Sequence, residues 1–217
     1  MNPNTLSPHP LNIHNIFTYE PSYPYPMFLL YYTQSNDFVP ERFVDNGKVG
    51  YQLANGEIVV RPQYEEGSDF LNGHAIVVKN NRKGIINTFG KILIPLIYED
   101  IRFFKEGLSR VKKNNKYGYV DILNREIIAC IYDEAGDFTS GHAPVAIKGK
   151  YGFVNTSGII KIPLLFDQVG DFSEGIAAVR KEGKWSFIDT YGERVIAPDL
   201  MNSLSFSDDE SLVSRDK

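Results

Sequence analysis

Apolar and polar residues alternate with a period of two along short stretches of the chain, for example over residues 117–122 and 185–189. Glycines and other turn-forming residues separate these stretches at regular intervals. Period-two alternation is typical of β-strands with one buried face, whereas an amphipathic helix repeats every 3.6 residues. The pattern therefore predicts an all-β protein made of short strands and tight turns.

The pattern recurs every 34 residues, without an insertion, in four independent series. The series are a strand glycine, a turn glycine or asparagine, an aromatic–acid pair and a Phe-x-x-Gly motif. Their members are Gly50, Gly84, Gly118 and Gly152; Gly56, Gly90, Asn124, Gly158 and Gly192; Tyr64-Glu65, Tyr98-Glu99, Tyr132-Asp133 and Phe166-Asp167; and Phe70/Gly73, Phe104/Gly107, Phe138/Gly141 and Phe172/Gly175. Paired-helix tetratricopeptide repeats share this period. The glycines and the proline of a typical unit would break such helices, so the period indicates a β repeat.

Each repeat is predicted to contain three strands, named A, B and C in chain order. In the fourth repeat they cover residues 151–155, 159–162 and 176–180. Gly158 supplies the positive φ of the tight turn between A and B, and Pro163 is expected to end strand B because proline cannot donate to a ladder. The longer link at 166–172 is the one place where the pattern allows a helical turn. The hairpin at 181–184 leads to the next strand A.

Several stretches carry the residues of a known repeat: Phe-Ser-Glu-Gly-Ile-Ala-Ala-Val at 172–179, Lys-Trp-Ser-Phe-Ile-Asp at 184–189, the Gly192 turn and Val-Ile-Ala-Pro at 195–198. In these residues the sequence resembles the bacterial WG-repeat (KWG) family, over about residues 38–200. The signature Trp-Gly position is occupied by Val49-Gly50, Lys83-Gly84, Tyr117-Gly118, Tyr151-Gly152 and Trp185-Ser186. The resemblance implies a bacterial repeat protein of a family that often has no assigned activity.

The strand count suggests about five repeats. Strands A and B occur five times and strand C four times, while residues 37–44 resemble a further strand C. The first and last fragments together make one complete unit. Two architectures fit: an open, curved β array, or a closed propeller-like ring in which the N-terminal strand completes the last unit.

The two ends of the chain differ from the repeats. Residues 1–37 are rich in proline and tyrosine and are predicted to form an N-terminal cap segment. The WG-repeat β domain is placed at residues 38–200. Residues 201–217 are rich in serine and acidic residues and are predicted to form a flexible acidic tail.

Composition and charge narrow the classes of function. The chain has 217 residues, 42% hydrophobic and 23% charged, with a formal net charge of −4, which is typical of a globular protein. Such mild acidity argues against nucleic acid or an anionic membrane as partner. No apolar run reaches the roughly 20 residues of a membrane-spanning helix. No signal-peptide pattern is present, and the lone Cys130 favours a reducing compartment, so a cytoplasmic location is predicted.

Candidate catalytic and metal chemistry is sparse. No nucleophile, phosphate-loop or zinc-protease motif occurs, so we predict no catalytic, cofactor-binding or metal-ligating residue and no cofactor. His74 and His142 occupy a repeat position that holds Leu108 or Ile176 elsewhere, which favours packed imidazoles over metal ligands. The acids that follow the aromatics recur in every full repeat and share one environment, so they are interpreted as caps of short turns rather than as an acid–base pair. These acids are Glu65, Glu99, Asp133 and Asp167.

Charge is sorted by position within the repeat. The C-to-A hairpins are basic, and the links from B to C are acidic. The predicted basic rim comprises Lys79, Arg82, Lys83, Lys112, Lys113, Lys116, Lys148 and Lys150. The predicted acidic rim comprises Glu65, Glu66, Asp69, Glu99, Asp100, Asp133, Glu134, Asp137, Asp167 and Asp171. Stacking in register would gather like loops into two separate rims, either of which could steer a protein partner.

These features favour a non-enzymatic protein–protein interaction module that uses its repeat loops as the binding surface. An adaptor fits this description, and so does an immunity-type protein that neutralises a toxin. The alternative is a small-ligand-binding or enzymatic protein with a cleft in the irregular third repeat, where Asn124, Cys130, His142 and Pro144 depart from the pattern. The sequence does not specify the partner or the oligomeric state.

Overall fold

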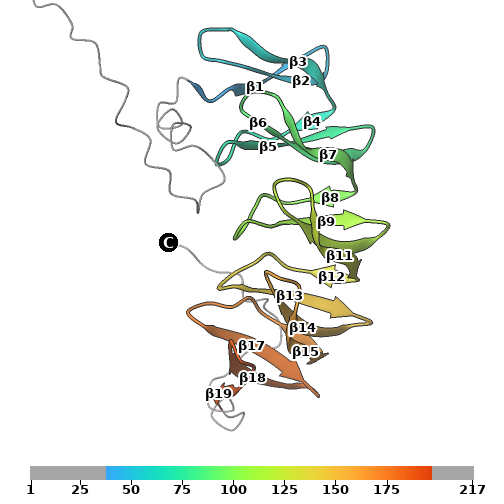
Figure 1. Ribbon diagram of the computed structural model, residues 1–217, viewed down its shortest axis with the longest axis vertical. Helices are drawn as coiled ribbons and strands as arrows, with labels where there is room; N and C mark the ends of the chain where they lie inside the picture. The colour runs from blue at the N-terminus through green and yellow to red at the C-terminus, as the bar shows by residue number, and fades with distance from the viewer. Residues whose placement is uncertain (1–37, 197–217) are drawn as a thin grey trace, which may run out of the picture. The chain divides into compact units, whose positions relative to one another are not determined.

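The computed structural model describes residues 38–196, and its regular elements there are the strands β1–β19 (Figure 1). The predicted all-β class of tandem repeats is therefore confirmed. The predicted cap segment at 1–37 and the predicted tail at 201–217 lie outside the described residues.

The strands form five antiparallel sheets that follow one another in chain order. The first sheet contains β1 (Glu41–Asp45), β2 (Lys48–Gln52) and β3 (Ile58–Tyr64). The second contains β4 (Glu66–Gly67), β5 (His74–Lys79), β6 (Arg82–Asn87) and β7 (Ile92–Tyr98). The third contains β8 (Asp100–Ile101), β9 (Ser109–Lys113), β10 (Lys116–Val120) and β11 (Glu126–Tyr132).

The last two sheets have the same four-stranded order. The fourth sheet contains β12 (Glu134–Ala135), β13 (His142–Ile147), β14 (Lys150–Asn155) and β15 (Ile160–Phe166). The fifth contains β16 (Gln168–Val169), β17 (Ile176–Lys181), β18 (Lys184–Asp189) and β19 (Arg194–Ile196). Each sheet thus joins strand C of one predicted unit to strands A and B of the next.

This grouping decides between the two predicted architectures. In the first sheet β1 takes the place of strand C and pairs with β2, so it does not complete the fifth sheet. All five sheets therefore have their own C, A and B strands, and the ring closed by an N-terminal strand is wrong for the described residues. Figure 1 shows the sheets as an open row, with the first and fifth at its two ends.

Four apolar cores lie between consecutive sheets, because each inner sheet buries both faces against its neighbours. Representative pairs of buried residues across the successive gaps are Tyr51 and Val77, Ile85 and Val111, Tyr119 and Val145, and Phe153 and Val179. Among the described residues no such core joins the first sheet to the fifth. The repeats are therefore stable only against one another, as in other repeat arrays.

The outer face of the first sheet is more polar than the inner faces. Glu41 and Gln52 stand where the second sheet places the buried Ala75 and Ile86. Charged and amide side chains can face water where alanine and isoleucine would be exposed. This substitution suits an end of an open array rather than a closed ring.

Strand B continues past its proline, contrary to prediction. In the fourth sheet β15 runs through Pro163 to Phe166, with a bulge between the pairs Tyr151↔Phe166 and Phe153↔Ile162. The bulge lifts residues out of the ladder, so the missing N–H of the proline costs no pairing there. Gly152 lies at this bulge, and a Cβ on it would stand 2.4 Å from the carbonyl oxygen of Ile162. This close approach accounts for the strand glycine of the first four sheets, whereas the fifth sheet has Ser186 at the equivalent position.

The link from B to C holds a short strand instead of a helical turn. In the fifth sheet this strand is β16, which pairs with β17 through Val169 and Val179. The backbone groups of the link are satisfied by strand C beside it, as in the bond from the N–H of Gly170 to the carbonyl oxygen of Ala178 (2.8 Å). A helical turn would leave these groups without their sheet partners.

Candidate functional site

The acids predicted to cap turns accept hydrogen bonds from backbone N–H groups, and the turns they hold are the C-to-A hairpins. Glu65 accepts bonds from Asn80 (3.1 Å) and Asn81 (3.3 Å). Its repeat equivalents accept one bond each: Glu99 from Asn115 (3.1 Å), Asp133 from Lys148 (2.7 Å) and Asp167 from Glu182 (2.8 Å). The prediction that these acids cap turns is confirmed. In each of the four hairpins a carboxylate of the link holds the backbone of the turn.

Two of these carboxylates also bind lysines of the preceding sheet. Asp133 contacts the ammonium group of Lys116, and Asp167 contacts that of Lys150 at 2.5 Å. The lysine hydrogen bond and the backbone N–H bond lower the pKa of both carboxyl groups. For Glu65 the lowering of the pKa comes first from the two backbone N–H groups.

The expectation of two separate charged rims is wrong, because acidic links meet basic hairpins of the neighbouring sheet. Besides the two pairs above, Lys83 binds Asp100 at 2.7 Å and Arg82 lies 3.5 Å from Glu99. The link begins beside the hairpins, so its first acids reach lysines and arginines rather than one another. The paired charges therefore partly neutralise each other.

The remaining members of the predicted rims lie apart from these pairs. Lys79 donates to Gln63 (3.3 Å), Lys112 lies over the Tyr117 ring, and Glu134 accepts a bond from the Tyr151 hydroxyl (2.7 Å). Within the described residues no ion pair involves Glu66, Asp171, Lys113 or the ammonium group of Lys148. Partial burial and the nearby Asp137 carboxylate raise the pKa of Asp171.

A second periodicity, of 68 residues, relates the first and third sheets. It places an arginine, a tyrosine and an aspartate at equivalent positions: Arg42, Tyr51 and Asp69 in one copy and Arg110, Tyr119 and Asp137 in the other. The tyrosine hydroxyls donate to carbonyl oxygens of the following link, at 2.8 Å for Tyr51 and 2.7 Å for Tyr119. Burial raises the pKa of Tyr51 to about 12, so this hydroxyl stays a donor at neutral pH.

The arginine of the third sheet is enclosed. The side chain of Arg110 is only 15% exposed, and it donates to the carbonyl oxygen of Ala135 at 2.6 Å. Its guanidinium lies 5.5 Å from the centroid of the Tyr117 ring and 3.8 Å from Asp137. Its Nε is buried and has no hydrogen-bond partner among the described residues. The contacts of this guanidinium therefore indicate a structural role.

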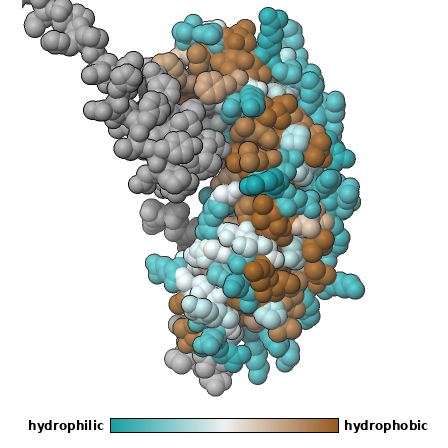
Figure 2. All heavy atoms as spheres, viewed as in Figure 1, coloured by the Kyte–Doolittle hydropathy of each residue, from teal (hydrophilic) through white to brown (hydrophobic). Residues whose placement is uncertain are grey.

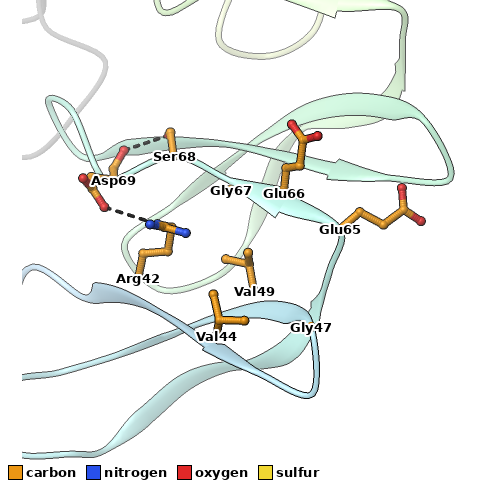
Figure 3. A pocket seen from close by; sticks show the side chains of 9 residues that line it. All are labelled: Arg42, Val44, Gly47, Val49, Glu65, Glu66, Gly67, Ser68 and Asp69. Carbon is orange, nitrogen blue, oxygen red and sulfur yellow. Dashed lines mark hydrogen bonds and ion pairs between the residues drawn. The ribbon is translucent and has the colours of Figure 1, made fainter.

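The arginine of the first sheet faces an open pocket of about 630 Å³, which we name the Arg42 pocket (Figure 3). It is lined by Arg42, Val44, Gly47, Val49, Glu65, Glu66, Gly67, Ser68 and Asp69. Arg42 is 42% exposed and lies 3.7 Å from Asp69, which is itself 89% exposed. Three acids of the predicted acidic rim therefore surround this pocket.

The A-to-B turns form another set of equivalent loops with fixed shapes. In the last four of these turns a side-chain oxygen at the start of the turn accepts bonds from the backbone N–H groups two and four residues later. These side chains belong to Asn87, Asp121, Asn155 and Asp189. Three turn tips carry large apolar side chains in equivalent positions, namely Phe89 (70% exposed), Leu123 (70%) and Tyr191 (84%).

The irregular residues of the third repeat make packing and turn contacts. Asn124 adopts a positive φ of 59° and accepts a bond from the Tyr98 hydroxyl (2.8 Å). Cys130 packs against the core between the second and third sheets, and burial raises its pKa to about 11. The His142 ring packs on Phe172, with 5.0 Å between ring centroids. The Arg42 pocket, by contrast, lies in the first and second sheets.

The histidines agree with their interpretation as packed imidazoles. His74 contacts the Phe104 ring (5.3 Å), and burial lowers its pKa. Within residues 38–196 no cluster of three or more His, Cys, Asp or Glu side chains could hold a metal ion. The same residues contain no helix of the length and apolarity that crossing a bilayer requires.

Comparison with known families identifies the repeat. The model of the WG containing repeat matches residues 50–82, 84–117, 117–151 and 151–185. The chain belongs to the WG-repeat family. In these WG repeats the signature glycine is the residue that approaches the bulge of strand B. A comparison with curated proteins found no match.

Solved structures with partial likeness include Hsv2 from Kluyveromyces lactis and a eukaryotic initiation factor. Hsv2 is 10% identical, with a TM-score of 0.44 over 74% of this chain and 60% of that chain. The initiation factor is 10% identical, with a TM-score of 0.48 over 71% of this chain and 50% of that chain. A protein of unknown function from Bacteroides caccae is 14% identical, with a TM-score of 0.30 over 74% of this chain and 77% of that chain. The chain thus spans 60% of Hsv2 and 50% of the initiation factor.

Two groups of candidate binding residues were not predicted from the sequence: the apolar turn tips and the equivalent arginines Arg42 and Arg110. The apolar turn tips were detectable, because Phe89, Leu123 and Tyr191 follow the 34-residue spacing. The paired arginine sites were also detectable as a 68-residue spacing, from Arg42 to Arg110. What the spacing could not show is that one arginine is enclosed and the other open.

Proposed function

We propose that this WG-repeat protein is a non-enzymatic protein-binding module whose contact surface is formed by its A-to-B turns. The observation that carries the proposal is the set of exposed side chains Phe89, Leu123 and Tyr191 at equivalent turn tips. Large apolar side chains at such exposed positions are typical anchors of protein interfaces. On the face shown in Figure 2, hydrophobic residues run as a broken column along the row of sheets beside hydrophilic residues.

The rigidity of the turns favours binding. Each turn that carries one of these apolar tips is held by two hydrogen bonds to one side chain, for example from the N–H groups of Leu123 (2.9 Å) and Arg125 (2.8 Å) to Asp121. A loop that already has its bound shape loses little conformational entropy on association. The repeats therefore present their apolar anchors in a fixed order along the array.

Within this proposal an adaptor is favoured over an immunity-type protein. The immunity hypothesis depends on an acidic field that would attract a basic toxin. Asp100, Asp133 and Asp167 each bind a lysine of the same chain, which weakens that field. A bacterial origin, a cytoplasmic location and the absence of nucleic-acid or membrane partners stay predictions.

The test removes the turn anchors together. The variant Phe89→Ser, Leu123→Ser, Tyr191→Ser should retain its fold, because the same position naturally holds Asn55 and Ser157. Proteins captured by the wild-type chain from its native cells are identified, purified and measured by calorimetry against both chains. We expect the triple variant to bind about tenfold or more weakly.

The matched control is Leu165→Ser, which removes an exposed apolar side chain (51%) from β15 rather than from a turn tip. It should leave the affinity unchanged. A purified partner that binds the triple variant as tightly as the wild type would contradict the proposal.

The alternative of a small-ligand-binding protein now has a specific place, the Arg42 pocket, in the first two sheets instead of the third repeat. The Arg42 guanidinium and the Asp69 carboxylate 3.7 Å from it could bind a small molecule with both an anionic and a cationic group. A thermal-shift screen of zwitterionic metabolites against the wild type and Arg42→Met tests this alternative. A stabilisation that disappears in Arg42→Met would favour it.

A further inference from the structure

The first and third sheets contain the same arginine site with one decisive difference. In the third sheet the guanidinium of Arg110 lies 5.5 Å from the centroid of the Tyr117 ring. In the first sheet the position equivalent to Tyr117 is Val49, and no aromatic ring covers Arg42 within the described residues. The exposed fraction of the side chain rises accordingly, from 15% at Arg110 to 42% at Arg42.

The space that the missing ring leaves is the Arg42 pocket. Val44 stands where the third sheet has Lys112, which also lies over the Tyr117 ring at 5.1 Å. Figure 3 shows Val44 and Val49 beside Arg42, below the segment that carries Glu65 to Asp69. Val49 is only 4% exposed, so the apolar surface of the pocket comes mainly from Val44, which is 57% exposed. Together with the cationic wall of Arg42 it offers the surfaces that an aromatic ring prefers.

A further difference between the two copies lies on the link side of the pocket. Gly67 replaces Ala135, whose carbonyl oxygen accepts the bond from Arg110. A Cβ at Gly67 would stand 2.4 Å from the Tyr51 hydroxyl oxygen and 2.8 Å from a methyl carbon of Val49. The first copy therefore cannot hold the alanine of the third copy without rearrangement, because the link packs closely on Tyr51 and Val49 at this glycine.

The margin of the pocket is acidic. Glu66 is exposed and Asp69 is 89% exposed, and Figure 3 shows the Glu65 and Glu66 carboxylates directed away from Arg42. Glu66 makes no ion pair within the described residues. Charge complementarity therefore favours a lysine or arginine next to the group that enters the pocket.

We propose that the Arg42 pocket binds a tyrosine or phenylalanine side chain of a partner protein, in a segment where a lysine or arginine adjoins the aromatic residue. The ring lies on Val44 and against the Arg42 guanidinium, as Tyr117 lies against Arg110. The neighbouring basic side chain faces Glu66 and Asp69. This inference rests on the proposed protein-binding function and names a second contact that the same partner would make.

The test uses the full chain, labelled with ¹⁵N, and three capped peptides as probes. The peptides are Gly-Tyr-Lys-Gly, Gly-Leu-Lys-Gly and Gly-Tyr-Glu-Gly. We expect the first to shift the amide signals of residues 42–49 and 65–69. Replacing tyrosine by leucine, or lysine by glutamate, should weaken binding by about threefold or more.

Two substitutions at one repeat position make a matched pair. Val49→Tyr restores the ring of the third repeat and should abolish binding of Gly-Tyr-Lys-Gly, because the pocket is then filled from within. Lys83→Tyr places the same side chain at the equivalent position of the second sheet, where Ile76 replaces the arginine, and should leave binding unchanged. Both variants should fold, since Tyr117 and Tyr151 occupy this position naturally.

The outcomes separate this inference from the proposed function. Undiminished peptide binding by Val49→Tyr, or shifts confined to other residues, would overturn the inference. So would an identified partner whose affinity is unchanged by Val49→Tyr but falls with the turn-tip triple variant, and in that case the proposed function stands. A partner that binds the triple variant normally but no longer binds Val49→Tyr would support the Arg42 pocket as a binding site. It would contradict the proposal that the A-to-B turns form the contact surface.

Discussion

Gly118 lies so close to β11 that a Cβ on it would stand 2.5 Å from the carbonyl oxygen of Ile128. The same approach recurs at Gly50, Gly84 and Gly152, each against the bulge of strand B in its own sheet. The signature glycine of the repeat therefore has a packing role within the sheet. It is not required by a special φ, because none of these four residues has a positive φ.

This relationship predicts a large cost for a single methyl group. Gly118→Ala should destabilise the protein by about 1–3 kcal/mol, since the backbone of β11 must move to accept it. Urea unfolding monitored by circular dichroism measures the change. Gly170→Ala is the control, because its Cβ would meet nothing closer than 3.9 Å. Equal stability of the two variants would contradict the packing role.

The buried tyrosine hydroxyls should each stabilise the array modestly. Tyr119→Phe removes the bond to the carbonyl oxygen of Gly136 and should cost about 1 kcal/mol in the free energy of unfolding. The ring itself can stay in place, because Phe153 occupies the equivalent position of the fourth sheet. Tyr191→Phe, at an exposed turn tip, should leave the urea midpoint unchanged.

The two equivalent arginines should differ in their effect on stability. Arg110→Ala removes a nearly enclosed side chain that bonds Ala135 and packs on Tyr117, so we expect a loss of about 2–3 kcal/mol. Arg42→Ala breaks only an exposed ion pair with Asp69 and should cost less than about 1 kcal/mol. Thermal and urea unfolding of both variants test the difference. Equal losses of stability would contradict the conclusion that Arg110 is enclosed and Arg42 is open.

The hairpin carboxylates predict a loss of stability in acid. The pKa values of Asp133 and Asp167 are lower in the folded chain than in the unfolded chain, where they lie near 4. Their stabilising effect is therefore complete above the unfolded pKa and disappears as the pH falls through the folded pKa. The urea midpoint should therefore fall as the pH drops below about 5.

The double variant Asp133→Asn, Asp167→Asn identifies the source of this pH dependence. It should be less stable than the wild type at pH 7 and should lose less stability on acidification. Glu174→Gln is a suitable control, because Glu174 makes no ion pair within the described residues. An unchanged pH profile in the double variant would assign the acid sensitivity to other groups.

The sequence predicted the strands and turns well, because they depend on local pattern. The A-to-B turns have the positive φ expected at Gly158 (79°) and Asn124 (59°), and the predicted caps Glu65 and Asp133 hold hairpins. The predicted end of strand B at Pro163 was wrong, because Pro163 lies in a bulge through which the strand continues. A bulge depends on the partner strand, which local pattern does not contain.

The charged rims show the same limit at longer range. Lysines do lie in the hairpins and acids in the links, as predicted. The two sets nevertheless form ion pairs with each other, for example between Lys83 and Asp100. Their meeting depends on how one sheet is placed on the next. A sequence read one repeat at a time contains no information on that placement.

By itself the sequence determined the repeat unit, its length and the position of its turns, because spacing, glycine and alternation act within a few residues of one another. The tertiary structure decided that the repeats form an open row, that acids and lysines neutralise each other across sheets, and that Arg42 is open where Arg110 is closed. These outcomes depend on contacts between sheets, such as the bond from Arg110 to the carbonyl oxygen of Ala135 in the next sheet.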